Sequence, residues 1–167
     1  DLDDQVVVKE QTLSTIPSDA ASSDLVDGEK LTLRDLLYCM MVDSANDAAA
    51  VIAEHISGDQ SAFVENMNKY ASEHGCTDTH FTNVTGLHDP QQVTTVRDLA
   101  KLLGSAIQNE QFCEIFGATE YAVKATNKSG QRNLLTGNFL MTYSGMEIYY
   151  DARVTGGRTG TNADGTR

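Results

Sequence analysis

Two amphipathic helical patterns stand almost end to end early in the chain, and they constrain the fold more than any other feature. In the first, apolar side chains recur at i, i+3, i+4, i+7 and i+8, the spacing of a half-buried helix: Leu33, Leu36, Leu37, Met40 and Met41. The second runs from Asn46 to just before Gly58 and carries alanine and isoleucine on one face. The junction at residues 42–46 is rich in capping and turn formers. Ser44 is therefore expected at a helix–helix junction that presents its side chain at a surface.

The rest of the sequence contains further helical patterns and several short extended ones. Residues 61–74 predict a third helix that stops at Gly75, and residues 94–106 predict a fourth. The buried side chains of the third are expected to be Phe63, Met67, Tyr70 and Ala71. Extended segments are expected at 5–9, 120–125, 148–154 and 156–160, and the acidic, serine-rich stretch 14–30 is expected to be a surface excursion. Helices in the first two thirds, with strands at the ends, favour an α+β fold.

The composition argues against several classes of ligand. With 24 acidic and 12 basic residues, the chain has a formal net charge of -12, which repels nucleic-acid phosphates and anionic lipid headgroups. Its three cysteines lack the C-x-x-C spacing of a zinc site, and Cys39 is expected to be a small buried apolar residue. The four histidines lack metal-ligand spacing, so no metal is expected. No organic cofactor is expected either. No apolar run in these 167 residues is long enough to cross a bilayer.

Two triplets, Ser44-Ala45-Asn46 and Arg158-Thr159-Gly160, carry little information alone because such triplets arise by chance. Their order and surroundings make them specific. The segments at 31–49 (with D-S-A-N-D-A-A), 63–71, 79–87 (T-H-F-T-N-V-T-G-L), 94–100 and 156–161 (G-G-R-T-G-T) resemble, in order, the landmarks of serine D-Ala-D-Ala carboxypeptidases, the low-molecular-mass penicillin-binding proteins. An Asn-x-Leu triplet of that family is matched at either 133–135 or 138–140. The resemblance covers essentially the whole chain.

This resemblance implies a β-lactamase/DD-peptidase-like fold, of which the chain would supply mainly the helical lobe and a few strands of an incomplete antiparallel sheet. The family uses three motifs, Ser-x-x-Lys, Ser-x-Asn and Lys-Thr-Gly. By resemblance, Ser44 and Asn46 would be catalytic: Ser44 would help to pass a proton to the leaving D-alanine, and Asn46 would hold the substrate backbone through its donor and acceptor. The implied substrate-binding residues, with the Thr161 amide as half of an oxyanion hole, are Arg158, Thr159, Gly160 and Thr161.

Two departures from the family pattern matter. No Ser-x-x-Lys occurs in the sequence, so the nucleophile is expected upstream of Asp1, and residues 1–167 are expected to be a partial domain, truncated at both ends and inactive alone. Arg158 stands where the family has lysine; a guanidinium keeps the charge and binds a carboxylate well, but it is bulkier and permanently protonated. Exposed edges of the incomplete sheet are expected to favour self-association.

The implied parent protein is an extracytoplasmic bacterial hydrolase that removes the terminal D-alanine of peptidoglycan stem pentapeptides through a serine acyl-enzyme, and that β-lactams acylate. A serine β-lactamase and a D,D-endopeptidase of the same fold are alternatives, although the loop 77–90 offers only Asp78 and Asp89 to activate a deacylating water. A third alternative is a catalytically silent module that binds peptidoglycan or a partner protein. Asp43 and Asp47, which flank Ser44, are assigned to capping and solvation.

Overall fold

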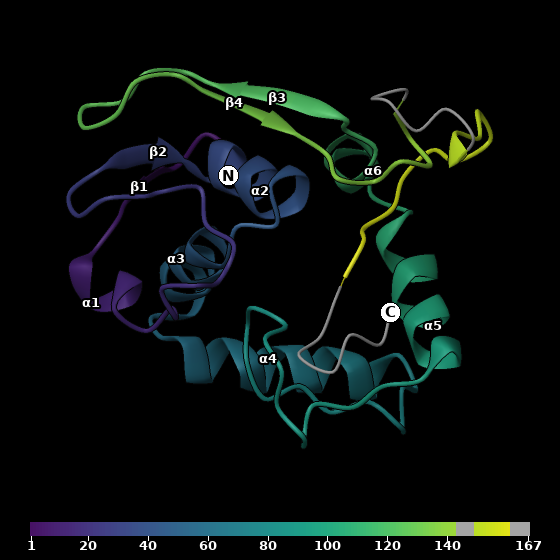
Figure 1. Ribbon diagram of the computed structural model, residues 1–167. Coiled ribbons are helices and arrows are strands. Elements are labelled where there is room, and N and C mark those ends of the chain that lie inside the picture. The colour runs from purple at the N-terminus through teal and green to yellow at the C-terminus, as the bar shows by residue number, and fades with distance from the viewer. Residues whose placement is uncertain (143–148, 161–167) are drawn as a thin grey trace. The chain divides into compact units, whose positions relative to one another are not determined.

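The computed structural model describes residues 1–142 and 149–160, which fall into two compact units. The first unit joins Asp1–Ile52 to Glu114–Thr159, and the second consists chiefly of Ala53–Cys113. In chain order (Figure 1), the elements are β1 (Gln5–Val7), α1 (Glu10–Leu13), β2 (Lys30–Thr32), α2 (Leu33–Val42), α3 (Asn46–Ser57), α4 (Gln60–Glu73), α5 (Val96–Ala106), α6 (Glu110–Phe116), β3 (Glu120–Val123) and β4 (Arg132–Leu135).

Two antiparallel strand pairs and helix α2 build the first unit. Val6 of β1 lies opposite Leu31 of β2, and Tyr121 of β3 lies opposite Leu134 of β4. Helix α2 packs against β2 and also against β3 and β4, as Figure 1 shows. The predicted antiparallel pairing is confirmed, but the strands form two separate two-stranded sheets. The core between these elements includes Val6, Val8, Leu25, Leu31, Leu36, Cys39, Val42, Ile115, Val123 and Leu134.

Helix α2 begins at a capping box and is fixed to β3 by an aromatic stack. The Thr32 hydroxyl accepts the Asp35 amide at 3.0 Å, while the Asp35 carboxylate accepts the Thr32 amide at 3.2 Å, so two helix-terminal N–H groups are satisfied. Tyr38 stacks on Tyr121 with ring centroids 3.7 Å apart. The Tyr121 phenol donates to Asp35 and the Tyr38 phenol donates to Glu114. Caps and stack together set the position of the β3–β4 pair on the helix.

The second unit contains the third and fourth helices that the sequence predicts. Helix α4 begins after Asp59, whose carboxylate accepts the Ala62 amide at 2.8 Å, and it is followed by Gly75 at φ 69°. Only glycine adopts that left-handed conformation without strain, which explains why the helix stops there. Helix α5 begins after Thr95, whose hydroxyl accepts the Asp98 amide. Both predicted helices are confirmed to within a few residues.

Asp98 of α5 ties the preceding loop to its helix from a buried position. Its carboxylate accepts hydrogen bonds from Lys101 Nζ at 2.8 Å, the Thr79 hydroxyl at 3.0 Å and the Asp78 amide at 3.0 Å. The hydrogen bond from Lys101 is the main reason that the pKa of Asp98 lies below its ordinary value. This aspartate belongs to the segment 94–100, and its contacts give that segment a structural role.

Two predictions are wrong, one on the burial of α4 side chains and one on the conformation of residues 149–154. On α4 only Ala71 is fully buried; Phe63 and Met67 are half-buried and Tyr70 is exposed, because the pattern of apolar residues does not say how much of the helix face is covered. Residues 149–154 contain a turn, closed by the Val154 amide on the Asp151 carbonyl at 2.9 Å, rather than an extended strand. Residue 148 lies outside the described residues.

Among the residues that the structure describes, no helix has the length and apolar character needed to span a bilayer. Self-association through the sheet edges stays a prediction.

Candidate active site

Ser44 lies where α2 gives way to α3, in the left-handed conformation with φ 60°. A non-glycine residue at positive φ is uncommon, and such strain of order 1–3 kcal/mol persists only where neighbouring contacts enforce it. Two such contacts are the amides of Asp43 and Ala45, which both donate to the Cys39 carbonyl at 3.2 Å and close the end of α2. The Ser44 side chain is exposed. The predicted helix–helix junction and the exposure of Ser44 are confirmed.

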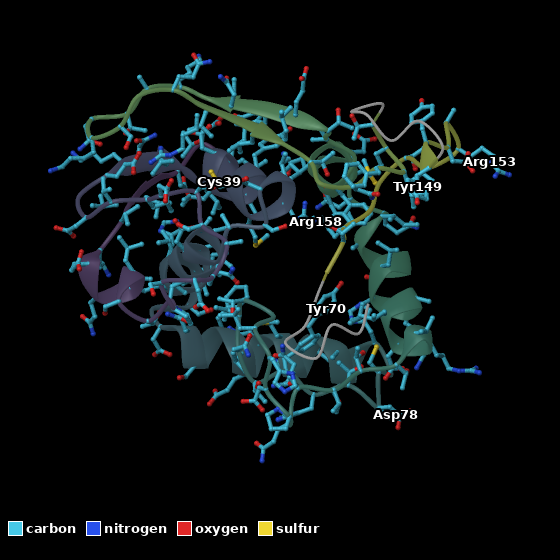
Figure 2. The ribbon with its side chains drawn as sticks, in the orientation of Figure 1. Cys39, Tyr70, Asp78, Tyr149, Arg153 and Arg158 are labelled. Carbon is cyan, nitrogen blue, oxygen red and sulfur yellow. The ribbon has the colours of Figure 1, made fainter. Side chains whose placement is uncertain are left out.

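Arg158, labelled in Figure 2, reaches the Ser44 side chain: its Nη2 donates a hydrogen bond to Ser44 Oγ. The guanidinium is half-buried, and this burial lowers its pKa, while the negative charge of Asp43 acts in the opposite direction. An arginine remains protonated at neutral pH even so. The contact joins the second and third sequence motifs across 114 positions of the chain.

The remaining residues of the third motif are placed less completely. Thr159 and Gly160 are both exposed, and Thr161 lies outside the described residues. The strand expected at 156–160 is absent from these five residues, all of which the structure describes. Gly156 and Gly157 are instead passed closely by side chains. An added Cβ would lie 2.5 Å from the Phe116 ring at Gly156, and 2.9 Å from Asn138 Nδ2 at Gly157. A larger residue at either position would therefore require the neighbouring side chain to move.

Asn46 is buried beside Ser44 and is bound to the segment that precedes α2 (residues 21–29, before β2). Its backbone amide and its Nδ2 both donate to the Ala21 carbonyl, at 2.9 and 2.8 Å. A carboxamide has two donor hydrogens and an acceptor oxygen, so one donor is already used within the protein. The expected pairing with a substrate backbone therefore involves the Oδ1 atom and the second hydrogen.

Asp47 holds the same segment with a fully engaged carboxylate. Oδ1 accepts the amides of Ser23 (3.2 Å) and Ala48 (2.9 Å), and Oδ2 accepts the Ser22 hydroxyl (2.7 Å) and the Leu25 amide (3.0 Å). Asp47 is buried, so the expectation that it is a solvated residue is wrong. The sequence places an acid directly after the motif but does not reveal its burial, because the four donors come mostly from residues more than twenty positions away.

Asp43 caps the end of α2, as expected, and its carboxylate also accepts the Ser23 hydroxyl at 2.8 Å. Both acids that flank Ser44 therefore bind the same preceding segment.

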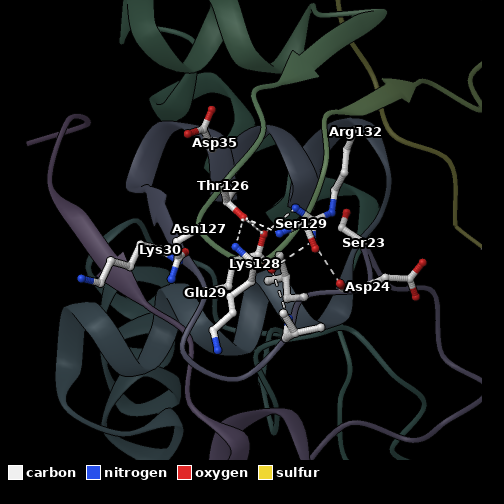
Figure 3. Close-up of polar contacts among 12 residues, drawn as sticks. Ser23, Asp24, Glu29, Lys30, Asp35, Thr126, Asn127, Lys128, Ser129 and Arg132 are labelled. Atoms are coloured by element: carbon white, nitrogen blue, oxygen red, sulfur yellow. Dashed lines mark hydrogen bonds and ion pairs between the residues drawn. The ribbon is translucent and has the colours of Figure 1, made fainter.

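The other end of that segment is fixed by a buried ion pair between Glu29 and Arg132 of β4 (Figure 3). Arg132 Nη1 and Nη2 donate to the two Glu29 oxygens at 2.7 and 2.9 Å, and Nη2 also donates to the Asp24 carbonyl at 3.0 Å. The Thr126 hydroxyl donates to the same carboxylate at 2.7 Å. Glu29 is fully buried and Ser23 and Leu25 are buried as well, so the prediction that 14–30 is a surface excursion is wrong for these three residues. Most of their neighbours between 21 and 30 are exposed, as predicted.

The electrostatics of Glu29 reflect a contest between burial and its partners. Burial alone would raise the pKa of this carboxyl, but the hydrogen bonds from Arg132, from Thr126 and from the Val26 amide outweigh it, together with the positive charge of Arg132. The pKa of Glu29 therefore lies below its ordinary value of 4.5. A charged Glu29 is favoured in the folded protein.

Acid is expected to destabilise the fold through Glu29 and Asp98. Both carboxyls have a folded-state pKa below the ordinary value, so their contribution is present above the unfolded pKa and is lost as the pH falls through the folded value. The urea midpoint, followed by circular dichroism, should fall between pH 7 and about pH 3. The double variant Glu29→Gln/Arg132→Met, which lacks one of these groups, should show a smaller fall. An equal fall would contradict the role given to Glu29.

The described residues contain no group of three or more histidine, cysteine, aspartate or glutamate side chains arranged to hold a metal ion. Cys39 is fully buried on α2, which confirms the expectation for that residue, and burial raises the pKa of its thiol to about 11. The thiol is therefore protonated at neutral pH and is a poor nucleophile.

Comparison with known proteins identifies a family that covers nearly the whole chain. A family model described as D-alanyl-D-alanine carboxypeptidase (Peptidase_S11) matches residues 1–166. The D-alanyl-D-alanine carboxypeptidase DacD of Escherichia coli K12 is 36% identical over 112 residues, which are 66% of this chain and 29% of that protein. The D-alanyl-D-alanine carboxypeptidase of Streptomyces sp. K15 is 32% identical over 136 residues, 75% of this chain and 47% of that protein. The chain thus spans less than half the length of these two curated relatives.

Solved structures give the same result for the fold. The crystal structure of the Streptomyces K15 DD-transpeptidase matches with a TM-score of 0.78 and 28% identity, over 87% of this chain and 60% of that one. Penicillin-binding protein 6B of Escherichia coli matches with a TM-score of 0.75 and 30% identity, over 86% of this chain and 45% of that one. The predicted DD-peptidase-like fold is confirmed.

Proposed function

Because this chain belongs to the D-alanyl-D-alanine carboxypeptidase family, we propose that a longer protein containing it removes the terminal D-alanine from peptidoglycan stem peptides through a serine acyl-enzyme. The observation that supports this most directly is the hydrogen bond from Arg158 to Ser44. It joins a cation suited to a substrate carboxylate with a hydroxyl suited to proton transfer, at a junction whose backbone is held in an unusual conformation. The site would work outside the cytoplasmic membrane, where peptidoglycan lies.

The chemistry requires a serine and a lysine that the family carries in its Ser-x-x-Lys motif, which is not among these 167 residues. The lysine would take the serine proton as the serine oxygen attacks the carbonyl of the penultimate D-alanine. The bond from that carbonyl to the terminal D-alanine would then break, and the departing amine would receive a proton. Water would finally hydrolyse the ester and release the serine. The present chain alone is proposed to be inactive.

Residues of this chain would act around that step. Ser44 would relay the proton toward the leaving amine, and Asn46 would hold the substrate backbone with Oδ1 and its second amide hydrogen. The Arg158 guanidinium and the Thr159 hydroxyl would bind the terminal carboxylate. Gly160 would let the peptide approach closely, and the Thr161 amide would donate to the oxyanion.

The substitution of arginine for the family's lysine narrows what residue 158 can do. A guanidinium offers paired donors that match a carboxylate, but its high pKa prevents it from giving up a proton at neutral pH. Arg158 is therefore assigned to binding and orientation, and the proton relay is assigned to Ser44. β-Lactams carry a carboxylate at the corresponding place, so they are expected to occupy the same site and to acylate the same serine.

The test uses a protein extended on both sides of this chain, incubated with fluorescent penicillin and analysed by mass spectrometry. We expect a covalent adduct on a serine of a Ser-x-x-Lys motif. Replacing Ser44 with alanine should slow labelling by roughly 10²–10⁴-fold, the usual contribution of a proton-transfer group. Arg158→Ala should weaken labelling strongly, whereas Arg158→Lys should retain most of it. A well-folded extended protein that forms no adduct would favour a silent peptidoglycan-binding module and overturn the proposal.

A further inference from the structure

Tyr70 of α4 is an exposed aromatic ring that its neighbours hold in one orientation. The residue is 45% exposed, yet one ring face stacks on His74, with centroids 4.0 Å apart and planes at 29°. Its phenol oxygen lies 2.8 Å from Ser105 Oγ, which in turn lies 3.1 Å from His74 Nε2. His74 Nδ1 lies 2.8 Å from the Tyr70 carbonyl, so the imidazole is fixed as well. The ring, labelled in Figure 2, is thus ordered before any ligand arrives.

A hollow of about 680 Å³ adjoins this ring, and all of its lining residues within the described part of the chain belong to the second unit. The hollow is a shallow groove that is open to solvent over most of its boundary, so a ligand would lie on it and would not be enclosed. Besides Tyr70 and Ser105, the lining consists mainly of three carboxamides and one acid: Gln108, Asn109, Glu110 and Gln111. An ordered ring beside a group of mixed donors and acceptors is suited to a ligand that has both an apolar face and many hydroxyl groups.

We propose that this hollow binds a saccharide, namely an N-acetylhexosamine unit of the peptidoglycan glycan strand. The C–H face of the sugar would lie on the ordered Tyr70 ring, and the carboxamides would exchange hydrogen bonds with its hydroxyl and acetamido groups. A stem peptide fits less well because its terminal carboxylate would meet Glu110, and the lining residues that the structure describes include neither lysine nor arginine. The choice of glycan rests on the proposed function; the saccharide chemistry rests on the hollow itself.

The experiment titrates the 167-residue chain with chitotetraose, a β-1,4-linked tetramer of N-acetylglucosamine, and follows the protein by NMR. Saturable binding is expected, with shifts concentrated at the hollow. Tyr70→Ala should weaken binding by at least about tenfold, and Gln111→Ala should weaken it several-fold. The matched control is Tyr149→Ala, because Tyr149 is also exposed, at 53%, but does not line the hollow. Its affinity should be unchanged. Circular dichroism checks that each variant is folded.

Three results would overturn the inference: no saturable binding, equal affinity for the wild type and for the Tyr70→Ala and Gln111→Ala variants, or binding of a D-alanyl-D-alanine peptide at the hollow in place of the saccharide. None of these depends on penicillin labelling. A labelled extended protein whose chain does not bind chitotetraose would keep the proposed function and remove this site. Tyr70-dependent binding of the saccharide, with no penicillin adduct on the extended protein, would keep this site and remove the proposed function.

Discussion

Replacing Arg132 with alanine is expected to lower the free energy of unfolding by about 3–5 kcal/mol, the usual result of removing one partner from a buried ion pair. The cause is the Glu29 carboxylate, which is 0% exposed and would be left in the interior with the Thr126 hydroxyl and the Val26 amide as its remaining partners. Urea unfolding, followed by circular dichroism, measures the effect.

Two comparisons make this prediction sharp. Arg153→Ala removes the same side chain from a pair with Asp151, but the Arg153 side chain is 88% exposed, so the urea midpoint should change little. The double variant Glu29→Gln/Arg132→Met removes the buried charge together with its partner and should recover much of the loss. If Arg132→Ala were as mild as Arg153→Ala, the ion pair would not be what fixes the segment that precedes α2 to strand β4.

Replacing Asp47 is the second large change, and here the isosteric substitution should be nearly as harmful as truncation. Asp47→Ala leaves several donors without their acceptor, and each unsatisfied buried group costs about 1–3 kcal/mol. Asp47→Asn keeps the shape, but each carboxylate oxygen faces an amide N–H, of Ser23 or of Leu25. Whichever way the new amide turns, its NH₂ group meets a donor. We expect both variants to lose about 3 kcal/mol or more of stability in urea unfolding.

Asp27 provides the matched control because it lies in the same segment, is exposed, and accepts the Glu10 amide at 2.9 Å. Asp27→Ala and Asp27→Asn should each cost about 1 kcal/mol or less. In the extended protein, Asp47→Asn should also slow penicillin labelling, since Asn46 is bound to the same segment through Ala21. A stable Asp47→Asn variant would show that the four contacts of the carboxylate do not hold the turn.

Helices α2 to α5 and their ends could be predicted from local sequence because their determinants are local, whereas the short helices α1 and α6 were not predicted. The apolar stripe of α2, the Thr32–Asp35 capping box and the glycines after α3 and α4 all act within a few residues. The exposed position of Ser44 followed from the same reasoning, since a junction between two helices is defined by the caps on either side.

The parts that could not be predicted depend on distant partners. From the local sequence Glu29 is expected to be an exposed acid. Its burial depends on the contact with Arg132, which lies 103 positions later in the chain. The glycines at 156 and 157 suggest a strand that admits another backbone, but in the structure it is the side chains of Phe116 and Asn138 that approach them closely. The proximity of Arg158 to Ser44 could be predicted only from the resemblance to a family, because the local sequence around each residue contains no information about the other.

The first unit is discontinuous in sequence, which has a consequence for how the protein is made. Asp1–Ile52 and Glu114–Thr159 must meet before Arg132 can reach Glu29, so a ribosome has to release the whole of residues 53–113 before that unit can close. Until then the buried side of α2 has no hairpin to cover it. The entropic cost of closing this long loop is smaller if the intervening helices become compact first. We therefore expect the second unit to gain structure early during synthesis and the first unit to follow.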